Sequence, residues 1–380
     1  MRLLHRVSET NTNYDILEKI GYNINSLYDN ILHTIKYENT SPRYLPKIDL
    51  PKNLHINNRE YDLNSNIYSS LIGSFLKTHN IDVFDSIISR FTPINIIKSV
   101  LKKHNTEIIY TFKYKSNLFK IIVFLENKVV LLDLINKAIK AFLFMEIFGF
   151  KNQNIKVFYY PTKFKKLDSK NRFIGISSVN SGFTTFKDVP EITIFRKEES
   201  DKVLIHELVH LLKLDFALLD NNSIDNIIIK NVNINKENQY INFFEAYTDS
   251  IAIIFNSIFN CIITKTHISS YFKLELLHLE DTVINILNHF DMESINDLLK
   301  KDNDRMLIQK TSVLSYYILK YGLLLQSSIL LTTFYPGIKW TDNQIKELYS
   351  LSINSLKKTK LNHNKLNLGS MKMSYNELIY

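Results

Sequence analysis

The chain has 380 residues, of which 45% are hydrophobic, 12% aromatic and 22% charged. This balance excludes an intrinsically disordered chain, and the length allows one large domain or a few tightly joined subdomains. The formal net charge is +9, but the lysines are spread along the chain, a pattern typical of a solvated surface. The single cysteine, Cys261, excludes an internal disulfide framework and favours a reducing compartment inside the cell.

No stretch of the sequence offers the ~20 uninterrupted apolar residues that a membrane-spanning helix needs. The two longest apolar runs, residues 250–263 and 321–335, are interrupted by asparagines or by Gln326 and a serine pair. Residues 1–11 are too short and too polar for a secretory signal. We therefore expect a soluble, intracellular protein without a membrane span.

The first hundred residues contain two stretches with apolar positions at helical spacing, residues 12–40 and 66–103. Prolines at three positions between these stretches exclude one continuous helix. We predict an N-terminal helical cap that comprises residues 1–103.

Residues 104–214 have the pattern of a mixed β-sheet that ends in a helix. In chain order, the expected elements are a β-hairpin at 108–124, a helix at 129–148, and strands at 155–160 and 189–195. Residues 178–185 are rich in turn formers, so a bend or bulge is expected there.

Beyond residue 198 almost the whole pattern is helical. The expected helices are 199–214, 237–259, 267–291, 305–331 and 341–356. Residues 215–356 would thus form a mainly helical subdomain, followed by a polar, loosely held tail at 357–380. The prediction is an α+β fold in which a mixed sheet precedes a helical half.

The most informative segment is the helix that contains His206, Glu207 and His210. Residues four apart share one face of a helix, so both imidazoles point to one place with Glu207 beside them. Two neutral histidines in this geometry suit Zn²⁺, and a carboxylate beside the open coordination position suits a general base. The neighbouring residues are apolar, so these buried polar groups need partners, and a shared metal ion would provide them.

A catalytic zinc site needs a third protein ligand and an open position for water. Glu245 and Asp249 lie four apart in an otherwise apolar helix, so both carboxylates face one way. Because a buried carboxylate without a partner is costly, we predict that Glu245 is the third metal ligand. Asp249 would then accept a hydrogen bond from a histidine ligand.

The motif HExxH at residues 206–210, followed by ExxxD at 245–249, resembles the gluzincin branch of the zincin metallopeptidases. The resemblance covers two helices and implies a zincin-like fold, one bound Zn²⁺ and hydrolysis of peptide bonds. It also implies that Glu245 binds the metal and that Asp249 orients a histidine ligand. The strand at 189–195 stands where these enzymes keep the edge strand that pairs with an extended peptide substrate.

The sequence departs from the family's pattern in two respects. The 34 residues between His210 and Glu245 are more than compact gluzincins have, and residues 215–236 are rich in asparagine, so an inserted loop is expected. The sequence also lacks the third histidine of metzincins and the Gly-Ala-Met-Glu-Asn segment of the aminopeptidase branch. It therefore does not indicate N-terminal trimming.

In the mechanism that the resemblance implies, Glu207 accepts a proton from a zinc-activated water and passes it to the leaving amine. A further donor must stabilise the tetrahedral intermediate, and in gluzincins this donor is a Tyr or His of the helical half. The candidates are Tyr316, Tyr317 and His278. The chain has 21 tyrosines, so ordinary core packing accounts for most of them.

Two other classes of function stay open from the sequence. One is a catalytically inactive zincin-fold protein with a structural or packaging role, in which zinc only stabilises the fold. The other is nucleic-acid binding through residues 156–172, where basic and aromatic side chains alternate. Glu207 favours a peptidase with a peptide or protein substrate, because a structural zinc site has no use for that carboxylate. The bias towards Asn, Ile and Lys would suit a large DNA virus or an AT-rich microbe.

Overall fold

The structure is a computed structural model. It describes residues 13–126, 130–166, 171–186, 190–235, 240–300, 305–361 and 371. The predicted N-terminal stretch 1–11, the predicted starts of elements at Val129, Val189 and residue 237, and most of the predicted tail 357–380 lie outside these residues.

Within the described residues, thirteen α-helices accompany a mixed sheet of seven strands. The sheet order is β1 (Lys36–Asn39), β3 (Thr106–Tyr114), β4 (Asn117–Leu125), β5 (Asn154–Thr162), β7 (Glu191–Arg196) and β6 (Gly182–Thr185), and β2 (Arg43–Tyr44) also pairs with β3. The β4–β5 and β5–β7 pairs are parallel and the others antiparallel. The predicted mixed sheet is thus confirmed, and so is its hairpin, which turns between Tyr114 and Asn117.

The predicted position of the edge strand is wrong. The strand expected at 189–195 exists as β7, but it lies between β5 and β6 and is therefore internal. The edge belongs to β6, inside the segment 178–185 that was expected to bend. The turn formers of this segment end at Gly182, after which Phe183, Thr184 and Thr185 are residues that favour strands.

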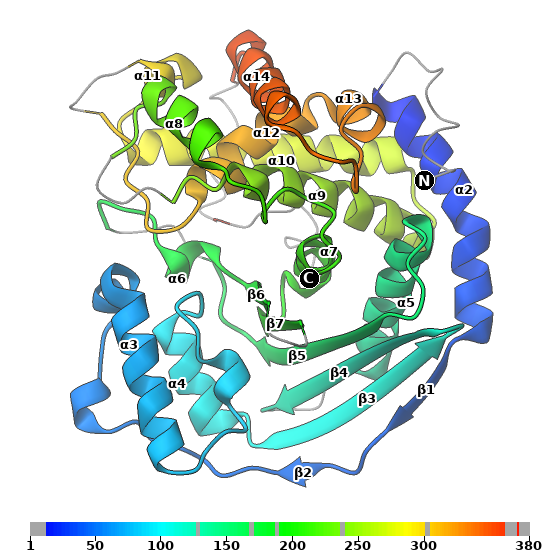
Figure 1. Cartoon of the computed structure of the whole chain (residues 1–380), viewed down its shortest axis with the longest axis vertical. Coiled ribbons are helices and arrows are strands. Elements are labelled where there is room, and N and C mark those ends of the chain that lie inside the picture. Colours follow the sequence, from blue (N-terminus) through cyan, green and yellow to red (C-terminus); the bar gives the residue numbers. More distant parts are fainter. Residues whose placement is uncertain are drawn as a thin grey trace.

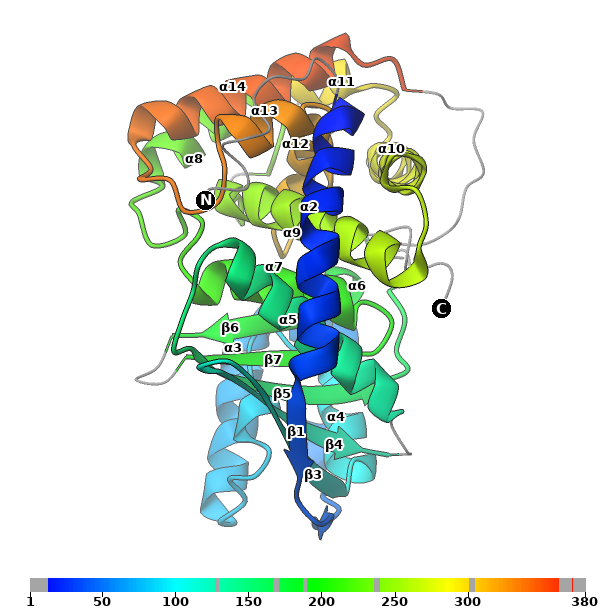
Figure 2. The same cartoon turned by 90° about the vertical axis from the view of Figure 1, so that its right-hand side faces the viewer.

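Helices cover both faces of the sheet (Figures 1 and 2). Strand β4 shows the division, because Ile121 and Val123 belong to one core and Ile122 and Phe124 to the other. The first core includes α2 (Asn13–Thr34), α5 (Leu131–Ile147), α7 (Ser200–Leu211) and the helical half. The second includes α3 (Asn58–Thr78) and α4 (Ile94–Lys103).

The predicted cap of residues 1–103 is therefore not one helical unit. Helix α2 packs with α5, α9 (Phe243–Thr264) and α10 (Ile268–His289), on the opposite face of the sheet from α3 and α4. The same region also contributes β1 and β2 to the sheet. Helix α2 ends at Thr34 rather than at residue 40, because the next residues pair with β3. Helical spacing in the sequence shows which residues are buried together, but not which face of a sheet they cover.

The helical half differs from the prediction in two places. The expected loop at 215–236 contains a helix, α8 (Asn222–Asn231). The helix expected at 305–331 is divided into a π-helical turn η3 (Leu314–Leu319), α12 (Lys320–Leu324) and α13 (Ser327–Thr332). The remaining described α-helices are α6 (Ile176–Val179), α11 (Ile295–Leu299) and α14 (Asp342–Lys358), and two 3₁₀ turns occupy Lys52–Leu54 and Asp85–Ile87.

Helix α9 has the length and composition of a membrane-spanning helix, and it is the one such helix among the described residues. In the structure, however, 83% of its most apolar window is buried inside the protein. It contacts α2, α7, α10 and α12 (Figure 2). These contacts are those of the central helix of a folded core. Such helices can have the same length and apolar composition as a membrane-spanning helix.

Gly182 allows β6 to lie close to α7. A Cβ atom at this position would lie 2.6 Å from Val203 Cγ1 and 2.8 Å from the carbonyl oxygen of Thr193.

We expect Gly182→Ala to lower the free energy of unfolding by about 1–3 kcal/mol, measured by denaturant titration, because the backbone oxygen cannot move aside without disturbing the sheet. Gly73→Ala is the matched control. Its Cβ would meet its nearest neighbour at 3.7 Å inside α3, so unchanged or raised stability is expected. Equal losses in both variants would contradict this interpretation.

Candidate metal centre

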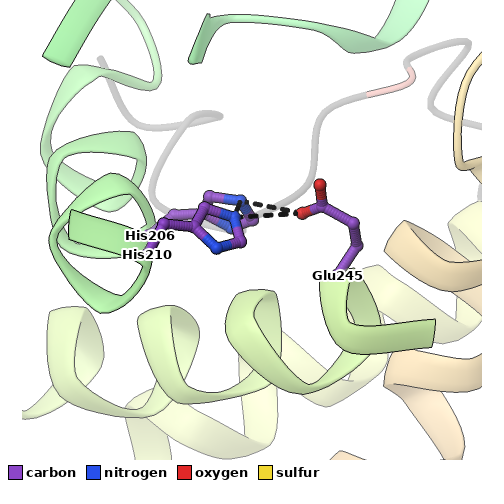
Figure 3. Close-up of side chains that lie close together, drawn as sticks. All are labelled: His206, His210 and Glu245. Atoms are coloured by element: carbon purple, nitrogen blue, oxygen red, sulfur yellow. Dashed lines mark hydrogen bonds and ion pairs between the residues drawn. The ribbon is translucent and has the colours of Figure 1, made fainter. Parts of the chain in front are cut away.

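The two histidines lie on the buried helix α7. Asp201 in its first turn suits the helix dipole, and every residue from Lys202 to His210 is buried. The rings of His206 and His210 lie one turn apart, with their centroids separated by 4.8 Å. Figure 3 shows both rings pointing towards Glu245, which belongs to the first turn of α9. The packing of α7 against α9 thus brings the three predicted ligands together.

The three ligand atoms form a triangle of suitable size for a tetrahedral metal ion. Glu245 Oε2 lies 3.1 Å from His206 Nε2 and 3.4 Å from His210 Nε2, and the two Nε2 atoms are 3.2 Å apart. A tetrahedral ion with bonds of ~2.0–2.1 Å requires ligand–ligand distances of about 3.3–3.4 Å. The observed triangle therefore matches one face of such a coordination sphere, and its fourth vertex is left for another ligand.

The outer nitrogen of each ring is held by a carboxylate. His206 Nδ1 lies 2.9 Å from Asp249 Oδ1, and His210 Nδ1 lies 2.5 Å from Asp215 Oδ2. Because an ionised carboxylate only accepts hydrogen bonds, each Nδ1 carries the proton. When both rings are neutral, each Nε2 atom presents its lone pair, so three acceptors then face one another. A cation resolves this conflict.

Two further observations fit a cation. Glu245 Oε2 is buried and has no hydrogen-bond partner of acceptable geometry. With neutral imidazoles, the charged side chains that touch the cluster carry a net charge of −2, because there are four carboxylates and two lysines. These are Glu207, Glu245, Asp215, Asp249, Lys202 and Lys320. One divalent ion would make the group neutral, which lowers the cost of burying it.

Asp215 was not predicted from the sequence. It lies in the turn after α7, within the stretch that was expected to be an inserted loop. Besides His210, its carboxylate accepts hydrogen bonds from the Thr248 hydroxyl and from the backbone amide of Ala217. Asp215 lies five residues after His210, which is not a helical spacing. The sequence therefore contained one indication of its role, namely an acidic residue shortly after a candidate histidine ligand. Asp215 orients His210 as Asp249 orients His206.

Glu207 lies between the metal ligands and the edge strand. Its Oε2 accepts a hydrogen bond of 2.7 Å from the hydroxyl of Thr184 on β6. Burial raises the pKa of Glu207 above its usual value, although His206 and the Thr184 hydroxyl act in the opposite direction. A carboxylate with a raised pKa, fixed beside a metal, is suited to accept and return a proton near neutral pH.

Two lysines that were not predicted flank Asp249. Lys202 Nζ lies 2.6 Å from Asp249 Oδ1 and Lys320 Nζ lies 2.7 Å from Oδ2, and all three side chains are buried. Burial alone would raise the pKa of Asp249, but the two ammonium groups and His206 hold it well below its usual value. Asp249 therefore stays ionised and can accept a hydrogen bond from His206 Nδ1.

The structure separates the two predicted tyrosines. The Tyr316 ring centroid lies 5.9 Å from that of His206. Burial and the charges of Glu245, Glu207 and Asp249 raise the pKa of Tyr316 well above its usual value, so its phenol stays protonated. Tyr317 instead donates a hydrogen bond to the carbonyl oxygen of Met371 and packs in the core. The remaining candidate, His278, is a buried residue in the middle of α10.

Part of the basic stretch at 156–172 is buried. Tyr159 and Tyr160 are fully buried, so their rings cannot stack on bases. Lys166 is buried in an ion pair with Glu199. Lys170 lies outside the described residues.

Comparison with known proteins gives one distant relative. Neither a protein-family model nor a solved structure matches the chain. An uncharacterized protein of Acanthamoeba polyphaga mimivirus is 26% identical over 251 residues, which cover 64% of this chain and 57% of that relative. The chain thus spans little more than half the length of this viral protein, whose name carries no activity.

We expect purified wild-type protein to bind about one divalent ion per chain and to unfold at a higher temperature when it is bound. Glu245→Gln should weaken the metal affinity at least about 100-fold, because it removes a direct ligand, and Asp215→Asn about 10–100-fold, because it removes only an orienting partner. The measurements are metal analysis and titration against a competing chelator. Glu347→Gln, an exposed change on α14, is the control and should bind like wild type. Equal affinity in all four proteins would exclude this centre.

The affinity for the metal should fall as the pH falls. Burial lowers the pKa values of His206 and His210, but their carboxylate partners outweigh it, so both pKa values lie above the usual 6.5. Protons and the metal compete for the two rings, so affinity is full above these raised pKa values and is lost as the pH falls through them. At a pH low enough to reduce the affinity, calorimetric titration in buffers of different ionisation enthalpy should detect protons released on binding. Binding without proton release would show that the imidazoles are not ligands.

Proposed function

We propose that the chain is a zinc-dependent peptidase of the gluzincin type, with a zincin-like arrangement of sheet and helices. One Zn²⁺ would be held by His206, His210 and Glu245. The observation that carries the proposal is the triangle of two Nε2 atoms and one carboxylate oxygen, in which both Nδ1 atoms are already bound by carboxylates. Zn²⁺ suits the site better than Mg²⁺ or Ca²⁺, because two of its three ligands are imidazoles.

Glu207 would serve as the general base and acid. A Zn²⁺ ion held by His206, His210 and Glu245 would supply Lewis-acid activation of a water molecule and of the substrate carbonyl. Glu207 then accepts the proton of the attacking water and passes it to the leaving amine, a role that its raised pKa supports. The Thr184 hydroxyl restrains the carboxylate while leaving Oε1 for the proton transfer. A structural or packaging protein would not need this arrangement.

Tyr316 is the best-placed donor for the developing oxyanion. It lies beside His206, and its raised pKa keeps the proton on the phenol at neutral pH. A neutral donor in a buried site stabilises negative charge that forms in the transition state.

The substrate would be an extended segment of a peptide or protein, bound along β6. The amide of Phe195 donates to the carbonyl of Ser181, and the β6–β7 register continues this pairing at Phe183. By the alternation of an antiparallel pair, the main-chain groups of Gly182 and Thr184 point away from β7, towards the unpaired edge. A peptide that pairs with them is held next to Glu207, because Thr184 contacts both. We further propose that the enzyme is a soluble viral protein, in view of its mimivirus relative and its buried α9.

Glu207→Gln should separate catalysis from metal binding. We expect the variant to retain about one zinc per chain and to cleave a peptide library at least about 100-fold more slowly than wild type, because it loses proton transfer but no metal ligand. Cleavage is followed by mass spectrometry, and metal content is measured in the same preparations. Cleavage by the variant at the wild-type rate would contradict the proposed function. Zinc binding without any cleavage by wild type would favour the structural role.

A further inference from the structure

Two pairs of residues face each other across the contact between α9 and the η3–α12 segment. Helix α9 contributes Glu245 and, one turn later, Asp249. The opposite segment contributes Tyr316 and, four residues later, Lys320. Tyr316 interacts with Glu245, and Lys320 forms an ion pair with Asp249. Helix α9 and the segment that carries Tyr316 are thus connected by two contacts that lie one helical turn apart.

The Lys320–Asp249 pair is fully buried. Its Nζ–Oδ2 distance is 2.7 Å, and neither side chain has exposed surface. A buried ammonium group is costly unless it is paired, so Lys320 can occupy this place only while α12 stays against α9. Lys202 binds the other oxygen of the same carboxylate at 2.6 Å, but it comes from α7, one turn before His206. Lys202 thus belongs to the helix that carries the histidines, and not to the segment that carries Tyr316.

Tyr316 lies in the π-helical turn η3, and Lys320 is the first residue of the α-helix that follows. Wide turns of this kind are rare and are frequently found at functional sites. At the start of the turn, the Tyr316 amide donates to the carbonyl of Ser312, and the Ser315 hydroxyl donates to that of Ile241. At its end, the ion pair of Lys320 attaches the turn to α9.

We propose that Lys320 is the positioning residue for Tyr316. By binding Asp249, it sets the π-helical turn against α9, so that the phenol faces the oxygen of the reacting carbonyl. Lys202 has a different role and acts only through Asp249 and His206. This inference rests on the proposed peptidase function, because Tyr316 has a catalytic role only in that reaction. Small displacements of a catalytic group have large effects on the rate, so the loss of Lys320 should be visible in turnover.

A double-mutant cycle tests the assignment. The variants are Lys320→Met, Tyr316→Phe and their combination, and methionine keeps the length of the side chain without its charge. We expect each single variant to lower kcat about 10–100-fold with little change in KM, since the phenol acts on the transition state. The combined variant should be no slower than Tyr316→Phe alone, because a misplaced phenol and an absent one are equivalent.

Lys202→Met is the matched control, because it removes a buried ion pair of similar length from the same carboxylate. Its effect should multiply with that of Tyr316→Phe, as for an independent site. Multiplicative effects of Lys320→Met and Tyr316→Phe would overturn the proposal. A coupling to Tyr316→Phe that is equally large for Lys320→Met and Lys202→Met would also overturn it. Lys320→Arg, which keeps the charge, should recover part of the turnover, and it replaces the Met variant in the cycle if that variant loses its cooperative unfolding transition.

A second measurement does not depend on activity. With 3-fluorotyrosine incorporated at position 316 of the zinc-loaded chain, the ¹⁹F spectrum should show one narrow signal in wild type and in Lys202→Met. In Lys320→Met the signal should broaden or split, because the ring samples several positions. An unchanged signal in Lys320→Met would overturn the proposal even if the enzyme is active. If wild type cleaves no peptide, the proposed function fails, while the spectrum still reports whether Lys320 positions Tyr316.

Discussion

The site depends on one electrostatic constraint, the approach of two imidazole nitrogens and a carboxylate oxygen to within hydrogen-bonding distance of one another, where neutral rings would leave no hydrogen to share. The constraint comes from the outer side of the rings, where Asp249 and Asp215 accept hydrogen bonds from the two Nδ1 atoms. Each carboxylate is itself neutralised or hydrogen-bonded, by buried lysines in one case and by Thr248 and Ala217 in the other. The surroundings of these three side chains therefore favour a divalent cation at this place, as proposed above.

The fold supplies this geometry by placing α7 between the sheet and α9. One face of α7 directs the histidines towards α9, while Glu207 is in contact with β6 through Thr184. Gly182 permits the close approach of strand and helix that this contact requires. Thr184 thereby couples the edge of the sheet to Glu207. Its main-chain groups point outwards from the edge, and its hydroxyl donates to the Glu207 carboxylate. In the proposed reaction, a strand-pairing substrate and a metal-activated water would meet at this place.

The two buried lysines distinguish this centre from a simple carboxylate–histidine–metal chain. Both bind Asp249, yet they tie it to different parts of the fold, Lys202 to the histidine helix and Lys320 to the segment with Tyr316. The carboxylate thus links the candidate metal ligands to the segment that carries Tyr316, the proposed donor for the transition state. The distant viral relative has no described activity, so the argument for function comes from these side chains and their contacts.

The sequence alone determined the local parts of the protein. Helical spacing placed His206 beside His210 and Glu245 beside Asp249, and alternation predicted the β3–β4 hairpin, because these patterns depend only on neighbours along the chain. Tertiary structure decided what depends on distant contacts. It made β6 the edge strand, brought Asp215, Lys202 and Lys320 to the site, and divided the N-terminal helices between two faces of the sheet. It also chose Tyr316 over Tyr317, because consecutive helical residues point in different directions and only packing decides which one faces the metal ligands.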